Sequence, residues 1–102
     1  MSRLDKLLKM LEAEPGDAFV LYGIAQEHAK QDRHQEAVAF YDRCLSIDPA
    51  YLYAYYHKSV SQQELGDLAQ ACESARQGIA QARRLGDNKA LSELQTLLDS
   101  LG

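Results

Sequence analysis

The chain has 102 residues, of which 46% are hydrophobic and 25% charged, and its net charge is −4. A chain of this length forms one domain, and this composition is typical of a globular protein rich in helix formers. The acidic balance and the scattered basic residues argue against a nucleic-acid partner. No run of 18 apolar residues is present, so we expect no membrane span and no membrane partner. Two cysteines without a CxxC motif favour a reducing compartment, and we expect a cytoplasmic protein.

The sequence predicts six short helices separated by tight turns, with no strand pattern. In the first helix, Ser2 to Ala13, Ser2 and Asp5 resemble a capping box. Its single apolar stripe consists of Leu4, Leu7, Leu8 and Leu11. The Pro15-Gly16-Asp17 turn ends this helix, and its aspartate can cap the next one.

The second helix, about Ala18 to Gln31, is apolar on two sides. One stripe consists of Leu21, Ile24, Ala25 and His28, and the other consists of Phe19, Tyr22, Gly23 and Gln26. Such a helix is packed on both sides, or is packed on one side and offers the other to a ligand. A polar turn that includes His34 leads to a third helix, about Gln35 to Ile47, which Asp48-Pro49 ends.

The fourth helix begins after Pro49, in a stretch that contains four of the six tyrosines. Tyr53 and Tyr56 point one way, with Val60 on the same side, whereas Tyr51 and Tyr55 lie nearly opposite. The side of Tyr55 also holds three polar residues, which are Lys58, Ser59 and Gln62. Periodicity alone therefore favours burial of Tyr53, Tyr56 and Val60.

Two more helices complete the chain. The fifth begins at about Leu68 and has Arg83 and Arg84 in its last turn, where positive charge suits the helix dipole. The sixth, about Asn88 to Ser100, has one stripe, formed by Ala90, Leu91, Leu94, Leu97, Leu98 and Leu101. The two terminal helices are apolar on one side only, as the ends of a stacked array require.

The helix boundaries recur, because Pro15 and Pro49 lie 34 residues apart. With this period the chain resembles the tetratricopeptide repeat, whose pattern is W-x₂-L-G-x₂-Y, then A-x₃-F, then P. The first copy follows this pattern at Leu21, Ile24, Ala25, His28, Ala37, Tyr41 and Pro49. The second copy has Tyr55 and Ala71 in place but departs at Lys58, Ser59, Gln62, Ala75 and Arg83.

The resemblance implies an all-α, antiparallel helix-hairpin solenoid, a right-handed superhelix of about six helices. We expect a single domain made of a capping helix at 1–14, repeats at 18–51 and 52–85, and a capping helix at 88–101. In this family the first helix of each repeat lines a concave groove that binds a peptide or a partner's helix. The matching positions are Phe19, Tyr22, Gln26, Lys30, Tyr53, Tyr56, His57, Val60 and Glu64.

The resemblance therefore implies a non-enzymatic protein–protein interaction module with a short aromatic groove. One alternative is that the groove aromatics pack against the neighbouring helix. Another is that the same surface forms a weak homodimer with no separate ligand. We expect no metal and no cofactor, because the histidines lack a ligand spacing and no catalytic motif is present. Cys44 and Cys72 are expected in the core.

Overall fold

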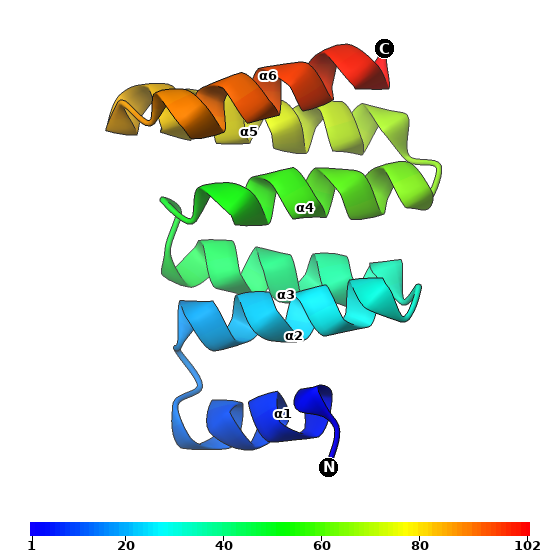
Figure 1. The fold of residues 1–102 in the computed structure, drawn as a ribbon, viewed down its shortest axis with the longest axis vertical. Helices are drawn as coiled ribbons and strands as arrows, with labels where there is room; N and C mark the ends of the chain where they lie inside the picture. The colour runs from blue at the N-terminus through cyan, green and yellow to red at the C-terminus, as the bar shows by residue number, and fades with distance from the viewer.

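A computed structural model describes all 102 residues and contains six α-helices and no strand (Figure 1). The helices are α1 (Arg3–Ala13), α2 (Ala18–Lys30), α3 (His34–Ile47), α4 (Leu52–Glu64), α5 (Leu68–Leu85) and α6 (Asn88–Leu101). Consecutive helices run antiparallel and stack along the longest axis of a molecule measuring 38 × 29 × 18 Å. The predicted all-α solenoid of helix hairpins is confirmed. None of the helices is both long and apolar enough to cross a membrane.

Aspartate and serine side chains begin four of the helices. Ser2 and Asp5 form the predicted capping box at the start of α1. Asp17 accepts a hydrogen bond from the Val20 amide, and Asp67 and Asp87 cap α5 and α6 in the same way. These contacts satisfy amide groups that a helix leaves without an internal partner.

The expectation that His34 lies in a turn is wrong, because His34 is the first residue of α3. Asp32 adopts a left-handed conformation with φ of 59°, which reverses the chain within three residues and lets the helix start early. The His34 Nδ1 atom lies 3.1 Å from the Ser61 hydroxyl, so this side chain joins α3 to α4.

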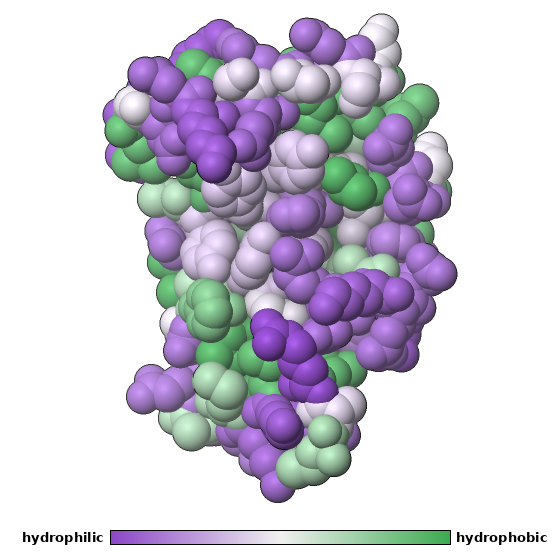
Figure 2. Space-filling model, in the orientation of Figure 1, coloured by the Kyte–Doolittle hydropathy of each residue, from purple (hydrophilic) through white to green (hydrophobic).

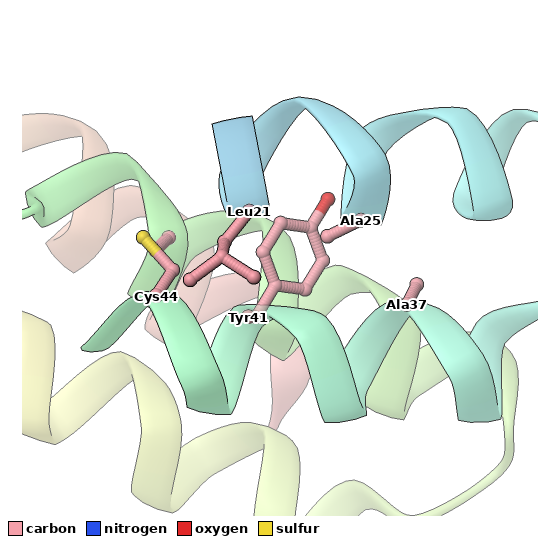
Figure 3. Packing of buried hydrophobic residues seen from close by; sticks show 6 residues of the cluster. Leu21, Ala25, Ala37, Tyr41 and Cys44 are labelled. Atoms are coloured by element: carbon pink, nitrogen blue, oxygen red, sulfur yellow. The ribbon is translucent and has the colours of Figure 1, made fainter. Parts of the chain in front are cut away.

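The core of the first repeat lies between α2 and α3 (Figure 3). Leu21 and Ala25 of α2 face Tyr41 and Cys44 of α3, and all four side chains are buried. Burial, followed by the Asp48 carboxylate, raises the pKa of Cys44 to about 11, so its thiol stays protonated. Cys72 is only partly buried, so the expectation of a core position holds fully for Cys44 alone.

In the second repeat, the side of α4 that holds Tyr55, Ser59 and Gln62 is the buried one. Burial of these polar groups is stabilised by hydrogen bonds to α5. The Ser59 hydroxyl donates to the Ala71 carbonyl at 2.7 Å, and the Ser74 hydroxyl donates to Gln62 Oε1 at 2.6 Å. The orientation implied by the repeat pattern is therefore right, and burial of Tyr53, which periodicity alone favoured, is wrong.

Candidate partner-binding groove

The first helix of each hairpin lies on one face of the molecule. In Figure 1, α2 and α6 pass in front of α3 and α5, and Figure 2 shows the same face as a surface. Side chains of intermediate hydropathy lie across its middle, and apolar side chains gather below them in the view. Two adjoining hollows open here, one of about 320 Å³ beside α1 and α2 and one of about 380 Å³ between α2 and α4.

Most of the residues predicted to bind a partner border these hollows. The first hollow is bordered by Phe19, Tyr22, Gln26 and Lys30, and the second by Gln26, Lys30, His57, Val60 and Glu64. We call these seven residues the α2–α4 groove. Phe19 is the most exposed of its aromatic groups, at 65%.

Tyr53 and Tyr56 border neither hollow. Tyr53 lies at the edge of the face and is 37% exposed. Tyr56 is half-buried, and with Val60 it packs against the buried cluster that includes Leu97 and Leu101 of α6. Its ring centroid lies 5.2 Å from that of His57, in an edge-on arrangement, so Tyr56 holds one side of the groove histidine.

Two further tyrosines, Tyr41 and Tyr51, complete the floor of the groove, although neither is among the residues predicted to bind a partner. The Tyr22 ring centroid lies 4.9 Å from that of Tyr51 and 5.9 Å from that of Tyr41. The His57 ring stacks on Tyr41 at 6.5 Å and meets the edge of Tyr22 at 6.0 Å. The sequence signal for Tyr51 was its place directly before the fourth helix, where the chain turns back toward α2.

A directed chain of hydrogen bonds crosses this floor. The Tyr41 hydroxyl donates to Gln26 Oε1 at 3.2 Å, and Gln26 Nε2 donates to the Tyr22 hydroxyl oxygen at 2.8 Å. The Tyr22 oxygen is thus an acceptor, and its own proton remains available to donate into the groove.

The floor is uncharged near neutral pH. Burial, followed by the neighbouring Tyr51, raises the pKa of Tyr22 to about 12, and burial lowers the pKa of His57. Charge is confined to the rim, where Glu27 Oε1 lies 2.8 Å from Arg3 Nε and 3.6 Å from Lys30 Nζ. The groove therefore presents neutral, amphipathic rings with one ion-pair cluster at its rim beside α1 and α2.

Ser61, His34 and Asp32 lie in a row at the edge of the second hollow. The His34 ring joins Ser61 at 3.1 Å, and its Nε2 atom lies 3.6 Å from Asp32 Oδ1. These residue types form nucleophilic triads in hydrolases, but here Ser61 is only 1% exposed and the Asp32 side chain is almost fully solvated. The row serves to pack α3 against α4. No group of three or more His, Cys, Asp or Glu side chains is placed to hold a metal ion.

Comparisons with known proteins agree with this geometry. Tetratricopeptide-repeat family profiles match residues 18–51 and 53–77. The chain is 29% identical over 98 residues to the TPR repeat-containing protein PA0015 of Pseudomonas aeruginosa, across 96% of this chain and 93% of that protein.

Two solved structures extend the comparison. The solution structure of a tetratricopeptide repeat domain protein from Salinibacter ruber is 36% identical, with a TM-score of 0.79 over 86% of this chain and 89% of that one. The TPR2B domain of yeast Sti1, solved in a complex with pHsp70, is 21% identical, with a TM-score of 0.90 over 96% of this chain and 78% of that one. The second likeness is one of fold alone.

Proposed function

The chain belongs to the tetratricopeptide-repeat family and is a protein–protein interaction module, and we propose that the α2–α4 groove binds an extended peptide or a partner's helix. The fold leaves one side of α2 and one side of α4, the first helices of the two repeats, accessible on the same face. Aromatic and amide side chains lie on this face. The complex of the Sti1 domain with pHsp70 supports this proposal, because a domain of the same fold holds a partner.

The observation on which the proposal rests is the hydrogen-bond chain from Tyr41 through Gln26 to Tyr22. It fixes three side chains in one orientation before a partner arrives, so little conformational entropy is lost on binding. It also leaves the Tyr22 hydroxyl as a donor, which suits a carbonyl of a peptide backbone.

Phe19 and His57 complete the proposed site. Phe19 is a large apolar ring that water surrounds in the free protein, and covering it would stabilise a complex. His57 presents a neutral ring supported on three sides by tyrosines. Tyr53 lies at the edge of the same face and is proposed as a rim contact.

The size of the groove limits the affinity. Two small hollows on two helices correspond to an interface at or below about 1,200 Å², where weak and transient complexes are found. We therefore expect modest affinity unless a partner makes a second contact elsewhere.

The experiment is a selection of binding peptides from a random library with the wild-type chain, followed by measurement of Kd for the selected peptides. Phe19→Ala removes the exposed ring, and Tyr22→Phe removes only the hydroxyl donor. We expect Phe19→Ala to weaken binding about tenfold and Tyr22→Phe about three- to tenfold, as typical for an interface anchor and one hydrogen bond.

Leu68→Ala provides the matched control, because Leu68 is a large apolar residue on α5 that is 49% exposed and lies outside the groove. Circular dichroism would establish that all variants are folded. Selected peptides that bind both groove variants as tightly as the wild type would refute the groove assignment. Loss of binding in Leu68→Ala alone would place the site near the start of α5, outside the groove.

A further inference from the structure

Three tyrosines gather where the first helices of the two repeats begin. The Tyr22 ring centroid lies 4.9 Å from that of Tyr51, and Tyr53 follows two residues later on the exposed side of α4. After burial, which has the largest effect, Tyr51 and Tyr53 both raise the pKa of Tyr22, so the three hydroxyl groups lie near one another. We call Tyr22, Tyr51 and Tyr53 the tyrosine edge.

Acidic side chains from several parts of the chain surround the tyrosine edge. Burial has the largest effect in raising the pKa of Tyr53, and the carboxylates of Glu93 and Asp87 raise it further. Burial and three neighbouring acidic groups raise the pKa of Tyr51 in the same way, and these groups are those of Cys44, Asp48 and Asp17. Because the buried Cys44 thiol stays protonated, the charge around the edge comes from four carboxylates.

No ion pair neutralises these four carboxylates. The ion pairs of the molecule all involve three other acidic residues, which are Glu27, Asp32 and Asp42. Lys89 is the one basic residue of α6 and pairs with none of the four, while Arg83 and Arg84 belong to α5, which passes behind α6. Helix dipoles add little, because the starts of α2, α4 and α6 lie at the same side of the molecule as the ends of α1, α3 and α5 (Figure 1). The tyrosine edge is therefore acidic overall.

Neutral aromatic rings with carboxylates beside them favour a cationic occupant. The face of a tyrosine ring attracts a cation through its quadrupole, and this attraction grows when water is excluded. A lysine or arginine side chain can lay its aliphatic stem on such rings and extend its charged end to a carboxylate. An acidic peptide would instead meet like charges at the same place.

We propose that the partner is basic, and that one of its lysine or arginine side chains lies over Tyr22, Tyr51 and Tyr53 with its charged end toward Glu93. This inference rests on the function proposed for the α2–α4 groove and specifies the chemistry of the partner.

The basic side chain at the far end of the groove does not oppose this occupant. Lys30 follows Tyr22 by eight residues, which corresponds to about 12 Å along α2. Exposed charges are screened over about 8 Å at physiological ionic strength. Lys30 also lies 3.6 Å from the Glu27 carboxylate, which offsets its charge further. We therefore expect the preference for a basic residue to be confined to the end of the peptide that lies on the tyrosine edge.

The test divides a random peptide library into two pools of equal diversity, one with arginine and the other with glutamate at the central position. Both pools are selected against the full wild-type chain, and Kd is measured for the selected peptides. We expect binders from the arginine pool to be at least about tenfold tighter. Exchange of the arginine for citrulline, which has the same shape and no charge, should weaken binding about three- to tenfold.

Glu93→Gln locates the contact. We expect this variant to bind arginine peptides about threefold more weakly and to bind their citrulline forms as the wild type does. Glu73→Gln on α5 is the matched control, because it removes an exposed carboxylate on a helix that passes behind α6, and it should leave both affinities unchanged. Circular dichroism would establish that both variants are folded.

The outcomes separate this inference from the groove function. Glutamate peptides that bind as tightly as the arginine ones, and lose affinity in Phe19→Ala, would overturn the basic partner and leave the groove function standing. Arginine peptides that Glu73→Gln weakens as much as Glu93→Gln would also overturn it, because the attraction would then depend on net charge alone. Peptides that bind wild type and Phe19→Ala equally, or two pools without binders, would overturn the groove function and this inference together.

Discussion

At Gly78, α5 lies close to both α4 and α6, and replacement of this glycine by alanine gives a sharp test of the packing. A Cβ atom at this position would lie 2.8 Å from Tyr55 Cβ and 3.0 and 3.1 Å from the two Leu94 methyl groups. Carbon atoms in contact are normally about 3.5 to 4.0 Å apart. The Leu94 methyls can rotate away, but Tyr55 Cβ is attached to the backbone, so α4 itself must shift.

Two opposing effects determine the result of Gly78→Ala. Overpacking of a core costs about 1 to 3 kcal/mol, whereas replacing glycine by alanine inside a helix stabilises by about 1 kcal/mol. Because the clash is with an atom that cannot move alone, we expect a net loss of about 1 to 2 kcal/mol. In a domain of this size, such a loss lowers Tm by about 5 to 15 °C.

Gly23→Ala is the matched control, since Gly23 also lies inside a helix with its face covered. A Cβ atom there would lie 3.4 Å from both Leu7 methyl groups, which is ordinary contact. The helix-propensity gain should therefore remain, and we expect stabilisation of up to about 1 kcal/mol. Urea and thermal unfolding followed by circular dichroism would measure both variants. A Gly78→Ala protein as stable as the wild type, or less damaged than Gly23→Ala, would refute the close approach of α4 to α5 at this glycine.

Two further predictions concern buried polar groups. Ser74→Ala should lower the free energy of unfolding, measured in urea, by about 1 to 3 kcal/mol, because it leaves Gln62 Oε1 buried without its hydrogen-bond donor. The control Ser100→Ala removes a hydroxyl from the last turn of α6 and should lower the free energy of unfolding by less than half as much. Burial lowers the pKa of His57, so the unfolded chain binds a proton more readily and stability should fall as pH drops below the ordinary histidine value of about 6.5. His28, whose pKa is lowered by burial and by Arg33, acts in the same direction, so His57→Gln should reduce the pH dependence without abolishing it. A pH dependence unchanged in His57→Gln would contradict the buried, neutral state of this ring.

The helices were predictable because each boundary has a local chemical cause. Proline, glycine and capping aspartate set the ends. For α1, α2, α3 and α6 each observed bound equals the expected one or differs from it by one residue. The buried side of α4 was not predictable from periodicity, because hydropathy treats Ser59 and Gln62 as solvent-facing. Their burial depends on hydrogen-bond acceptors and donors in α5, twelve residues further along the chain. The sequence pattern of α4 alone contains no information on these partners.

The groove residues show the same division. The sequence placed Phe19, Tyr22 and Gln26 on one face of a helix, and the structure brings these residues to one surface. The sequence did not indicate that Tyr41, a buried residue of the repeat pattern, directs its hydroxyl out of the core to the side chain of Gln26. When the ring of a tyrosine is buried and only its hydroxyl reaches the binding surface, the hydrophobic sequence pattern identifies the residue only as a core aromatic.

The two repeats take their buried aromatic ring from opposite helices of the hairpin, and this difference shapes the groove. In the first repeat the large side chain comes from the second helix, as Tyr41, and packs on Leu21. One period later, the position of Tyr41 is Ala75 and that of Leu21 is Tyr55, so the aromatic ring comes from the first helix instead. Each repeat keeps one buried aromatic ring, while the residue opposite it changes from Leu21 to the smaller Ala75. Matching one position at a time therefore underrates the second repeat.

The exchange also changes the polar chemistry of the surface. Tyr55 directs its hydroxyl to the Pro49 carbonyl, 2.8 Å away, whereas Tyr41 directs its hydroxyl to the groove amide of Gln26. Ala75 has no hydroxyl to send to α4, so the second repeat has no equivalent of the Tyr41–Gln26 contact. The oriented donors of the α2–α4 groove consequently belong to the first repeat. A partner that crosses both repeats should make its directional hydrogen bonds on α2 and mainly ring and rim contacts on α4.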